Sequence, residues 1–499
     1  MEKNFWGKCG TAATRCGWYA LVGAVLLGIW GCNRTDIEPA LDYPEDIAPL
    51  LRKSCATTGC HNATSARATA GLNLETWDDL FRGSRGGSPI IPYSPDQSYL
   101  LFSINTDTSI GPTLTPTMPF NDAPLTAEEY NRIWQWIDDG ARNANGEERF
   151  PPDPTRRKWY IGHSECDAVA VIDVESRQIM RYIEVGRQPN EIENVLDVRV
   201  SPDGKDWFVV FSTYNTHIER YSTLTDEKVA DIELGNFGWN RMEFSADGRY
   251  AFVVGDYFQE MVVVDLQQNA VVGSRKYFAQ ETTNPVAHPQ RSELYMPQHF
   301  ASAITVVGYG TDGTLGTTRD VDLVQHLAPA HSGELDPHDI AFLPEQERYF
   351  VSCWRSEEIR VFDATTDTLR AAIALPSAPG VITPSPDGQR LFISCTGDLA
   401  SWNGEPGRMG SIMVLNTGTL EIESVIYSGF QPYGIEVDAG LNALVVANRN
   451  VDVNGPRPHH QSTCGERNGY LTLIDLGTLE LIDDYKPELL ANPICVAIK

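Results

Sequence analysis

The chain has 499 residues, a formal net charge of −28, and an apolar content of 42%. That content is enough to bury a core, and the length suits two domains or one large β architecture. The 41 glycines and 31 prolines indicate many turns and favour β structure over long helices. The acidic surface repels phosphate backbones, so we exclude nucleic acid as a partner.

Residues 1–31 have the pattern of an export signal. Basic residues precede an apolar run over 18–30 that is too short to span a bilayer comfortably. The run ends in IWGC, which resembles the lipobox of bacterial lipoproteins and implies cleavage before Cys32 and a lipid on its thiol. A plain secretory signal and an uncleaved anchor are the alternatives, and all three export the chain. In the lipoprotein pattern Asn33 favours an outer-membrane lipoprotein, facing the periplasm or the cell surface, whose only membrane contact is its lipid.

Apolar spacing predicts helices in residues 43–145. PEDIAPLLRKSC places an apolar stripe just before Cys55, and LTAEEYNRIWQWIDDGA places another. Thr126, followed by acidic residues, is typical of a helix start, and Gly140 supplies the stop. The stretch between these helices is loop-rich, and we expect it to have no core of its own and to need a group to pack around. Residues 146–157, with three prolines, predict a stiff linker.

From 158 to 499 short apolar strands recur with turn punctuation. The turn SPDG at 201–204 returns as SADG at 245–248 and as SPDG at 385–388, and strands such as VAVID, MVVVD and LTLID end in Asp. Four strands in each unit of roughly 42 to 59 residues are typical of a propeller, and the third strands number seven. We therefore predict an all-β seven-bladed propeller.

The two ends of this region complement one another. In each unit the first strand is expected to lie innermost in the ring. The region begins with a strand of the kind that stands second in the other units, without a first strand before it, and it stops at a strand of the first, inner kind, ICVAIK. We predict that 494–498 pair with 159–161 and close one blade, which removes an open sheet edge. The SPDG turns and Asp-ended strands resemble YVTN-type seven-bladed propellers over the whole of 158–499. That resemblance implies a fold and says little about function.

The motif CATTGCH at 55–61 combines two thiols with a histidine. Haem c is attached when two thiols add to its vinyl groups and the histidine after the second thiol binds the iron. Four residues separate Cys55 and Cys60 here instead of the usual two, and Gly59 offers the backbone freedom that such a bulge needs. Residues 33–150 contain one histidine, His61, and one methionine, Met118, and a low-spin class I cytochrome needs one of each to bind its iron.

The order of motifs in 43–142 resembles the planctomycete-type cytochrome c domain. The segments IIPYSPDQSYLL, TMPF and WIDDGA follow the cysteine motif in that order. The resemblance implies a small, mainly α-helical domain with one covalent haem c, with Cys55 and Cys60 as thioether sites, His61 as proximal ligand and Met118 as distal ligand. We expect the closing helix, with Trp134 and Trp136, to cover the porphyrin edge.

Other interpretations of the cysteine motif remain. Cys55 and Cys60 suit a disulfide in an exported loop. A zinc site fits less well, because the region offers no fourth ligand of Cys or His type. In the propeller, Cys166 and Cys464 lie in loops of adjacent blades and suit a bridge, whereas the pairing of Cys495 is open. Cys353 and Cys395, in the same strand of consecutive blades, favour burial over a disulfide.

On one predicted face of the propeller, histidines lie in or beside loops, and Trp402, His459 and His460 are among the residues expected there. A metal or substrate site built from them competes with an ordinary solvated rim, since polar residues gather in loops anyway. His338, in DPHDI at the mouth of the central channel, is the best candidate for a functional contact. No Ser/His/Asp arrangement or GxSxG motif is apparent, so we predict no catalytic residue. The candidate residues of this rim site are His163, His217, His299 and His338.

Three functions follow from these motifs. The first is an exported haem c electron-transfer protein whose propeller docks a redox partner protein or a small-molecule ligand. The second is a two-domain oxidoreductase with a second redox or metal centre on the propeller rim. The third is a surface binding or scaffolding protein with a degenerate haem motif. We favour the first, because the ligands that a haem needs are all present in residues 33–150.

Overall fold

A computed structural model describes residues 42–499 except 85–86, 189, 256, 277–281, 283, 332, 398–408, 459–463 and 483–484, and residues 41–499 form one compact unit. The predicted signal peptide and Cys32 lie outside the described residues. No helix in the described part of the chain has the length and apolar character to cross a membrane. The described α-helices precede residue 140 and are α1 (Ala48–Ser54), α2 (Trp77–Arg82), α3 (Tyr99–Ile104) and α4 (Ala127–Asp138). Short 3-10 helices are η1 (Ala66–Ala68) and η2 (Pro95–Gln97) in the same region and η3 (Pro344–Gln346) further along the chain.

The predicted ends of α4 are present. The Thr126 hydroxyl caps the helix by accepting a hydrogen bond from the Glu129 N–H, and the Glu129 carboxylate accepts one from the Thr126 N–H. This pair of bonds is a capping box. Gly140, at φ +93°, follows the helix in a conformation that favours glycine. The expectation that the stretch between α1 and α4 lacks a core is wrong. Apolar side chains of α2 and α3 are buried there, among them Trp77, Leu80, Phe81, Leu100, Leu101 and Ile104.

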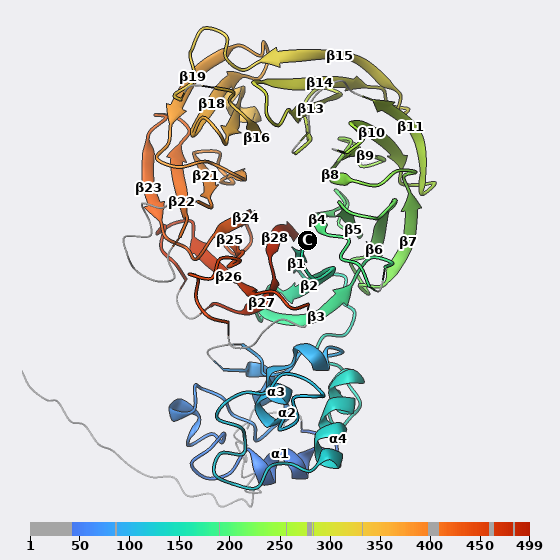
Figure 1. The fold of residues 1–499 in the computed structure, drawn as a ribbon, viewed down its shortest axis with the longest axis vertical. Helices are drawn as coiled ribbons and strands as arrows, with labels where there is room; N and C mark the ends of the chain where they lie inside the picture. Colours follow the sequence, from blue (N-terminus) through green and yellow to red (C-terminus); the bar gives the residue numbers. More distant parts are fainter. Residues whose placement is uncertain are drawn as a thin grey trace, which may run out of the picture. The chain divides into compact units, whose positions relative to one another are not determined.

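The described residues from Lys158 onward form seven four-stranded antiparallel sheets. Figure 1 shows the sheets as blades of a ring, with strands such as β8, β16 and β24 toward its middle and β7, β11 and β15 outside. This confirms the seven-bladed propeller. From the inner to the outer strand, the first three blades are β4 (Val195–Val200), β5 (Asp206–Phe211), β6 (His217–Ser222) and β7 (Lys228–Glu233); β8 (Trp239–Phe244), β9 (Tyr250–Gly255), β10 (Glu260–Asp265) and β11 (Ala270–Lys276); and β12 (Val286–Ala287), β13 (Glu293–Pro297), β14 (Ala303–Tyr309) and β15 (Leu315–Asp322).

Three further blades follow the same order. They are β16 (Pro337–Leu343), β17 (Arg348–Cys353), β18 (Glu358–Asp363) and β19 (Leu369–Ala374); β20 (Ile382–Pro384), β21 (Arg390–Cys395), β22 (Ser411–Asn416) and β23 (Ile422–Ile426); and β24 (Pro432–Asp438), β25 (Ala443–Asn448), β26 (Asn468–Asp475) and β27 (Glu488–Ala491). The repeated turn explains their spacing. In its first copy, the Ser201 hydroxyl donates to the Asp203 carboxylate at 2.8 Å, and Gly204 takes a φ of +69° that favours glycine.

The seventh blade joins the two ends of the propeller region. Its order is β28 (Pro493–Ile498), β1 (Lys158–His163), β2 (Ala168–Asp173) and β3 (Gln178–Glu184). Trp159 pairs with Ile498 and Ile161 with Val496 in antiparallel register, as the order of strand types predicted. Each of the seven sheets thus contributes its inner strand to the ring, and the edge of β1 is covered.

A buried ion pair ties this closing blade to the next one. The Lys158 ammonium, at the start of β1, donates to Asp226 at 2.7 Å and to the Thr223 carbonyl at 2.8 Å, and the Tyr160 hydroxyl donates to the same carboxylate at 3.1 Å. The side chains of Lys158 and Asp226 are 2% and 1% exposed. Removing one partner therefore leaves a buried, uncompensated charge.

We expect Lys158→Met to lower the free energy of unfolding by roughly 3–5 kcal/mol, because it strands the Asp226 carboxylate. Adding Asp226→Asn to that variant should recover most of the loss, since Asn carries no charge, accepts from Tyr160 and tolerates the positive φ of residue 226. Urea unfolding followed by circular dichroism measures both variants. Equal losses in the single and double variants would contradict this account.

Candidate functional site

His61 and Met118 line the same cavity, together with Cys55. Its volume of about 340 Å³ lies within the roughly 300–1,000 Å³ typical of small-molecule and cofactor sites. The lining is mainly apolar, with Leu72, Leu74, Ile91, Leu100 and Ile104 among its residues. The structure therefore brings together three of the four residues predicted to hold a haem, and Cys60 is not among those that line the cavity.

A tight chain reversal places His61 beside Cys55. Helix α1 ends at Ser54, and the Cys55 N–H still donates to the Leu51 carbonyl at 2.8 Å. The chain then turns back, so that the His61 N–H donates to the Cys55 carbonyl at 3.0 Å. Gly59, at φ +87°, allows the turn, and its N–H is held by the Ser65 hydroxyl at 2.9 Å. The two extra residues of the motif therefore lie in the turn, and His61 still hydrogen-bonds to the backbone of Cys55.

Both cysteines of the motif are free thiols in the structure. Cys55 is buried, and burial raises its pKa to about 12, with a smaller contribution from Cys60. The disulfide alternative is therefore not formed here. Nor does the motif assemble a zinc site, because the one group of metal-ligating side chains found among the described residues lies in the propeller.

Helix α3 holds the Met118 segment against the cavity. The Met118 N–H donates to the Ser103 carbonyl at 2.7 Å, and the Leu114 N–H donates to the Phe102 carbonyl at 3.1 Å. Ser103 and Tyr99 of the same helix also line the cavity. The thioether is half-buried and belongs to the rim of the apolar core.

The donor set of this cavity fits a haem. The Nδ1 atom of His61 is buried without a hydrogen-bond partner, which is the kind of orphaned polar atom that a ligand accounts for. Burial lowers the pKa of His61, and the Leu72 backbone carbonyl opposes that shift in part. The imidazole is therefore neutral at pH 7, which is the form that binds iron. A neutral imidazole and a thioether in an apolar cavity are the partners of a His–Met haem.

The expectation that the closing helix covers the porphyrin edge is not met. Trp134 and Trp136 are absent from the residues that line the cavity. Trp136 is buried, its indole N–H donates to the Arg142 carbonyl at 2.9 Å, and its ring meets Tyr43 edge-on at 5.9 Å. Trp136 anchors the end of α4 instead, and the cavity is lined by Leu100 and Ile104 of α3.

The four rim histidines do not form one site. His163 is 0% exposed at the end of β1, with Nδ1 at 3.2 Å from the Ala168 carbonyl and no partner on Nε2. It lies beside the loop between β1 and β2, as expected, but the adjoining strands bury its side chain. His299 contacts Asp336 through Nδ1, and His338 lies on the inner strand β16 with Nε2 at 3.2 Å from the Tyr433 hydroxyl. These last two neighbour one another near Asp336 and the channel.

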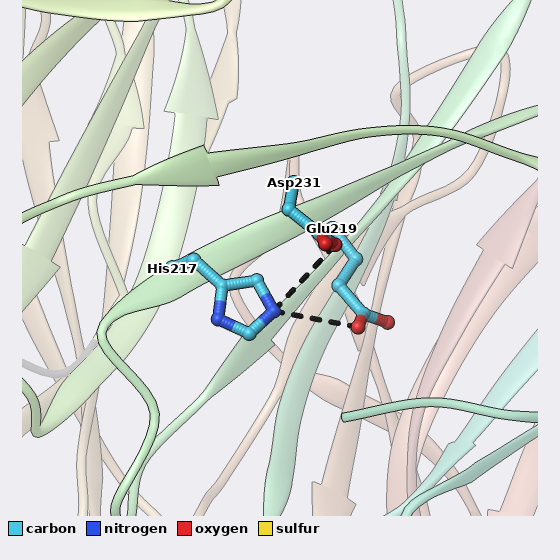
Figure 2. A group of neighbouring side chains, drawn as sticks. All are labelled: His217, Glu219 and Asp231. Carbon is cyan, nitrogen blue, oxygen red and sulfur yellow. Dashed lines mark hydrogen bonds and ion pairs between the residues drawn. The ribbon is translucent and has the colours of Figure 1, made fainter. Parts of the chain in front are cut away.

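His217 belongs to a charged cluster on the outer half of its blade. Figure 2 shows its Nε2 directed at Glu219 and Asp231, with oxygens at 3.4 and 3.7 Å. The Lys228 ammonium bonds the same Glu219 oxygen and lies 3.3 Å from Asp231. Glu219 also accepts from the Tyr221 hydroxyl at 2.7 Å, and its pKa is lowered by His217, Lys228 and Tyr221 against the effect of burial. Lys228 and Arg187, whose guanidinium lies 3.2 Å from Asp231, balance the charges of the two carboxylates, which argues against a metal there.

The propeller cysteines behave largely as expected. Cys166 and Cys464 form a disulfide with Cα atoms 5.3 Å apart, across 298 residues of sequence. Cys353 and Cys395 are buried thiols outside any disulfide of the described residues, and so is Cys495, whose pairing was open. The expected rim residues Trp402, His459 and His460 lie outside the described residues.

Residues 58–111 match the family model described as Planctomycete cytochrome C. The match includes Cys60 and His61, begins after Cys55 and ends before Met118. Together with the seven blades that follow, it confirms the resemblance of the N-terminal region to a cytochrome c domain joined to a propeller. The matched domain suggests haem c and electron transfer.

Among curated proteins, Antigen Lp49 of Leptospira interrogans serogroup Icterohaemorrhagiae serovar copenhageni (strain Fiocruz L1-130) is 21% identical over 293 residues. The alignment covers 57% of this chain and 61% of that protein, so the chain spans less than two thirds of this relative.

Two solved structures share the propeller fold. A putative 6-phosphogluconolactonase from Bacteroides uniformis ATCC 8492 has a TM-score of 0.52 at 13% identity, covering 69% of this chain and 99% of that one. The periplasmic gluconolactonase of Pseudomonas aeruginosa has a TM-score of 0.51 at 15% identity, again covering 69% and 99%. At these identities the likeness shows the fold alone.

Burial of His163 predicts a pH dependence of stability. Its pKa is lowered by burial from 6.5 to about 4, so between these values the unfolded chain binds a proton that the folded chain does not. Stability is therefore lost as pH falls from 6.5 toward 4, by up to about 3 kcal/mol from this group. We expect His163→Gln to show a smaller loss between pH 7 and pH 4.5 in urea unfolding.

The matched control is His326→Gln, which removes an exposed histidine and should keep the full pH dependence. An unchanged loss in the His163→Gln variant would show that another group dominates.

Proposed function

We propose that this chain is an exported haem c electron-transfer protein whose propeller serves as a docking or ligand-binding platform. The observation that carries the proposal is the cavity shared by Cys55, His61 and Met118. In the proposed site, the thiols of Cys55 and Cys60 attach one haem, and His61 and Met118 are its axial ligands. The match of 58–111 to a cytochrome c family supports the same assignment.

The chain's own residues prepare this site. The hydrogen bond from His61 N–H to Cys55 fixes the imidazole beside the first thiol, and burial keeps the imidazole neutral. The bond from Met118 N–H to Ser103 holds the thioether in place, and the leucine and isoleucine lining excludes water. A haem held by His and Met supplies single-electron transfer at a fairly high potential.

Export and lipid anchoring are part of the proposal. The segment 1–31 and the IWGC motif support a lipoprotein signal with Cys32 as the lipid site. The Cys166–Cys464 disulfide adds support, because such bonds persist in oxidising compartments outside the cytosol. The partner would be a redox protein or a small molecule that meets the propeller.

The alternative, an oxidoreductase with a second centre on the propeller rim, has less support. Lys228 and Arg187 balance the two carboxylates of the His217 cluster, and His163 is buried away from the other candidates. Only His299 and His338 lie near one another, and no third metal-ligating side chain in the described residues joins both of them within one group.

The visible spectrum tests the haem assignment. In a host that matures cytochromes c, we expect the mature protein to show a haem c spectrum that changes with dithionite. Met118→Leu should keep the haem but lower its midpoint potential by on the order of 100 mV, because it removes the thioether ligand. Redox titration measures the shift.

The control for that variant is Met261→Leu, a buried methionine of the propeller strand β10, where the same swap should leave the potential unchanged. A colourless parent protein would refute the haem assignment, and an unshifted potential in Met118→Leu would refute the distal ligand.

Lipid anchoring is tested separately. We expect the parent chain to incorporate radiolabelled palmitate and to sediment with membranes, and Cys32→Ser to do neither, because it removes the only thiol that the motif assigns to the lipid. A Cys32→Ser variant that stays in the membrane fraction would favour an uncleaved anchor instead.

A further inference from the structure

The propeller supplies one wall of the cavity that holds His61 and Met118. Residues far apart in the sequence contribute to it, from the start of β3 and from the start of β27. The remainder of the cavity is lined by the helical region, including Thr69 and Ala70 just after η1, residues of α3, and Met118. Its members are Arg177, Gln178, Ile179, Pro487 and Glu488.

Hydrogen bonds fix this wall to the helical region. The Gln178 side-chain amide, buried at the start of β3, donates to the Phe81 carbonyl at the end of α2. Further along β3, the Tyr182 N–H donates to the Ser94 hydroxyl at 3.3 Å. The Arg181 guanidinium lies 5.5 Å from the centre of the Tyr93 ring. The wall is therefore held by backbone and side-chain contacts and is a built part of the cavity.

The wall also carries the formal charges of the cavity. Among the lining residues, Arg177 is the one with a guanidinium or ammonium group and Glu488 the one with a carboxylate. The Arg177 guanidinium lies 5.8 Å from the centre of the Tyr485 ring, an aromatic face that favours its cationic form. The Glu488 carboxylate accepts from the Asn468 amide at 2.7 Å. Burial raises the pKa of the neighbouring Tyr99 hydroxyl, and the Glu488 charge adds to that shift.

We infer that the outer strands of the propeller complete the haem site, with Arg177 as the partner of a haem propionate and Glu488 as the opposing charge. A haem carries two propionate carboxylates, and a guanidinium binds a carboxylate with two parallel hydrogen bonds. In an apolar cavity such a pair is screened less than on the surface. This inference rests on the proposed function, because it requires the haem.

Two consequences follow from the shared site. Arg177 favours the more negatively charged, reduced form of the centre, and Glu488 favours the oxidised form. In addition, a group bound by both walls stabilises the contact between the helical region and β3, because it binds the docked arrangement and not the separated one. The propeller is then part of the electron-transfer centre as well as a platform.

Redox titration of two single variants tests the charges. We expect Arg177→Gln to shift the midpoint potential down and Glu488→Gln to shift it up, with the visible spectrum unchanged. Gln keeps the length of each side chain, and at position 177, where φ is +58°, it costs the backbone no more than Arg does. The control is Arg370→Gln on β19, the corresponding outer strand of another blade, which should leave the potential unchanged.

Hydrogen–deuterium exchange of the full chain tests the wall independently. We compare the haem-loaded parent with a Cys55→Ala, Cys60→Ala variant that cannot attach haem. Peptides that cover 177–182 and 487–491 should exchange more slowly in the loaded protein, whereas β6 and β7 should exchange equally in both.

The outcomes separate this inference from the proposed function. A parent protein without haem overturns both. A haem-loaded parent whose potential is indifferent to Arg177→Gln and Glu488→Gln overturns the charge assignment. Equal exchange of the wall peptides in the loaded and unloaded proteins overturns the shared site while the haem assignment stands.

Discussion

The hydrogen bond from the His61 N–H to the Cys55 carbonyl is the constraint on which the N-terminal region depends. It closes a seven-residue reversal that ends helix α1, loops out the residues between the cysteines and returns the imidazole to the first thiol. A second backbone hydrogen bond, from the Met118 N–H to the Ser103 carbonyl, places the thioether at the same cavity from a later segment of the chain. The imidazole of His61 and the thioether of Met118 reach the same apolar cavity because these two backbone hydrogen bonds fix the positions of the residues that carry them.

The propeller obtains its rigidity from a closed ring. Pairing of β28 with β1 joins the C-terminal strand to the blade that begins the region, and the buried Lys158 and Asp226 pair couples that blade to the next. The Cys166–Cys464 disulfide bridges the same blade to its other neighbour. The closing blade is also the one whose outer strand, β3, contacts the helical region. The blade held by these three contacts therefore carries Arg177, Gln178 and Ile179 of the cavity wall, which suits a wall that must hold the Arg177 charge in place.

Local patterns allowed most of the propeller to be predicted. The S-x-D-G turn repeats because its Ser and Asp hydrogen-bond to each other and its Gly adopts the positive φ that the tight turn requires. The third strands end in Asp because that carboxylate accepts hydrogen bonds from the backbone of the turn that follows. Closure followed from the order of strand types alone. The cysteine and histidine motif and the lone methionine likewise identified which residues share the cavity, since their chemistry restricts the choice.

Tertiary contacts account for what sequence could not provide. Arg177 and Glu488 reach the cavity only through the packing of β3 and β27, and nothing near either residue signals it. His163 lies beside a loop as expected, but β2 and β28 flank the end of its strand and bury its side chain, which the loop position did not indicate. The short helices α2 and α3 were missed because six residues give too little periodicity to recognise. Thr76, which caps α2 by accepting from the Asp79 N–H, was the available signal.

Intact-protein mass spectrometry under denaturing and reducing conditions tests the central claim most directly. The claim predicts a mature chain heavier by one haem that denaturation cannot remove, with the added mass confined to a peptide that contains both Cys55 and Cys60. A chain that carries no added mass on that peptide, and whose two thiols react with iodoacetamide, would contradict it.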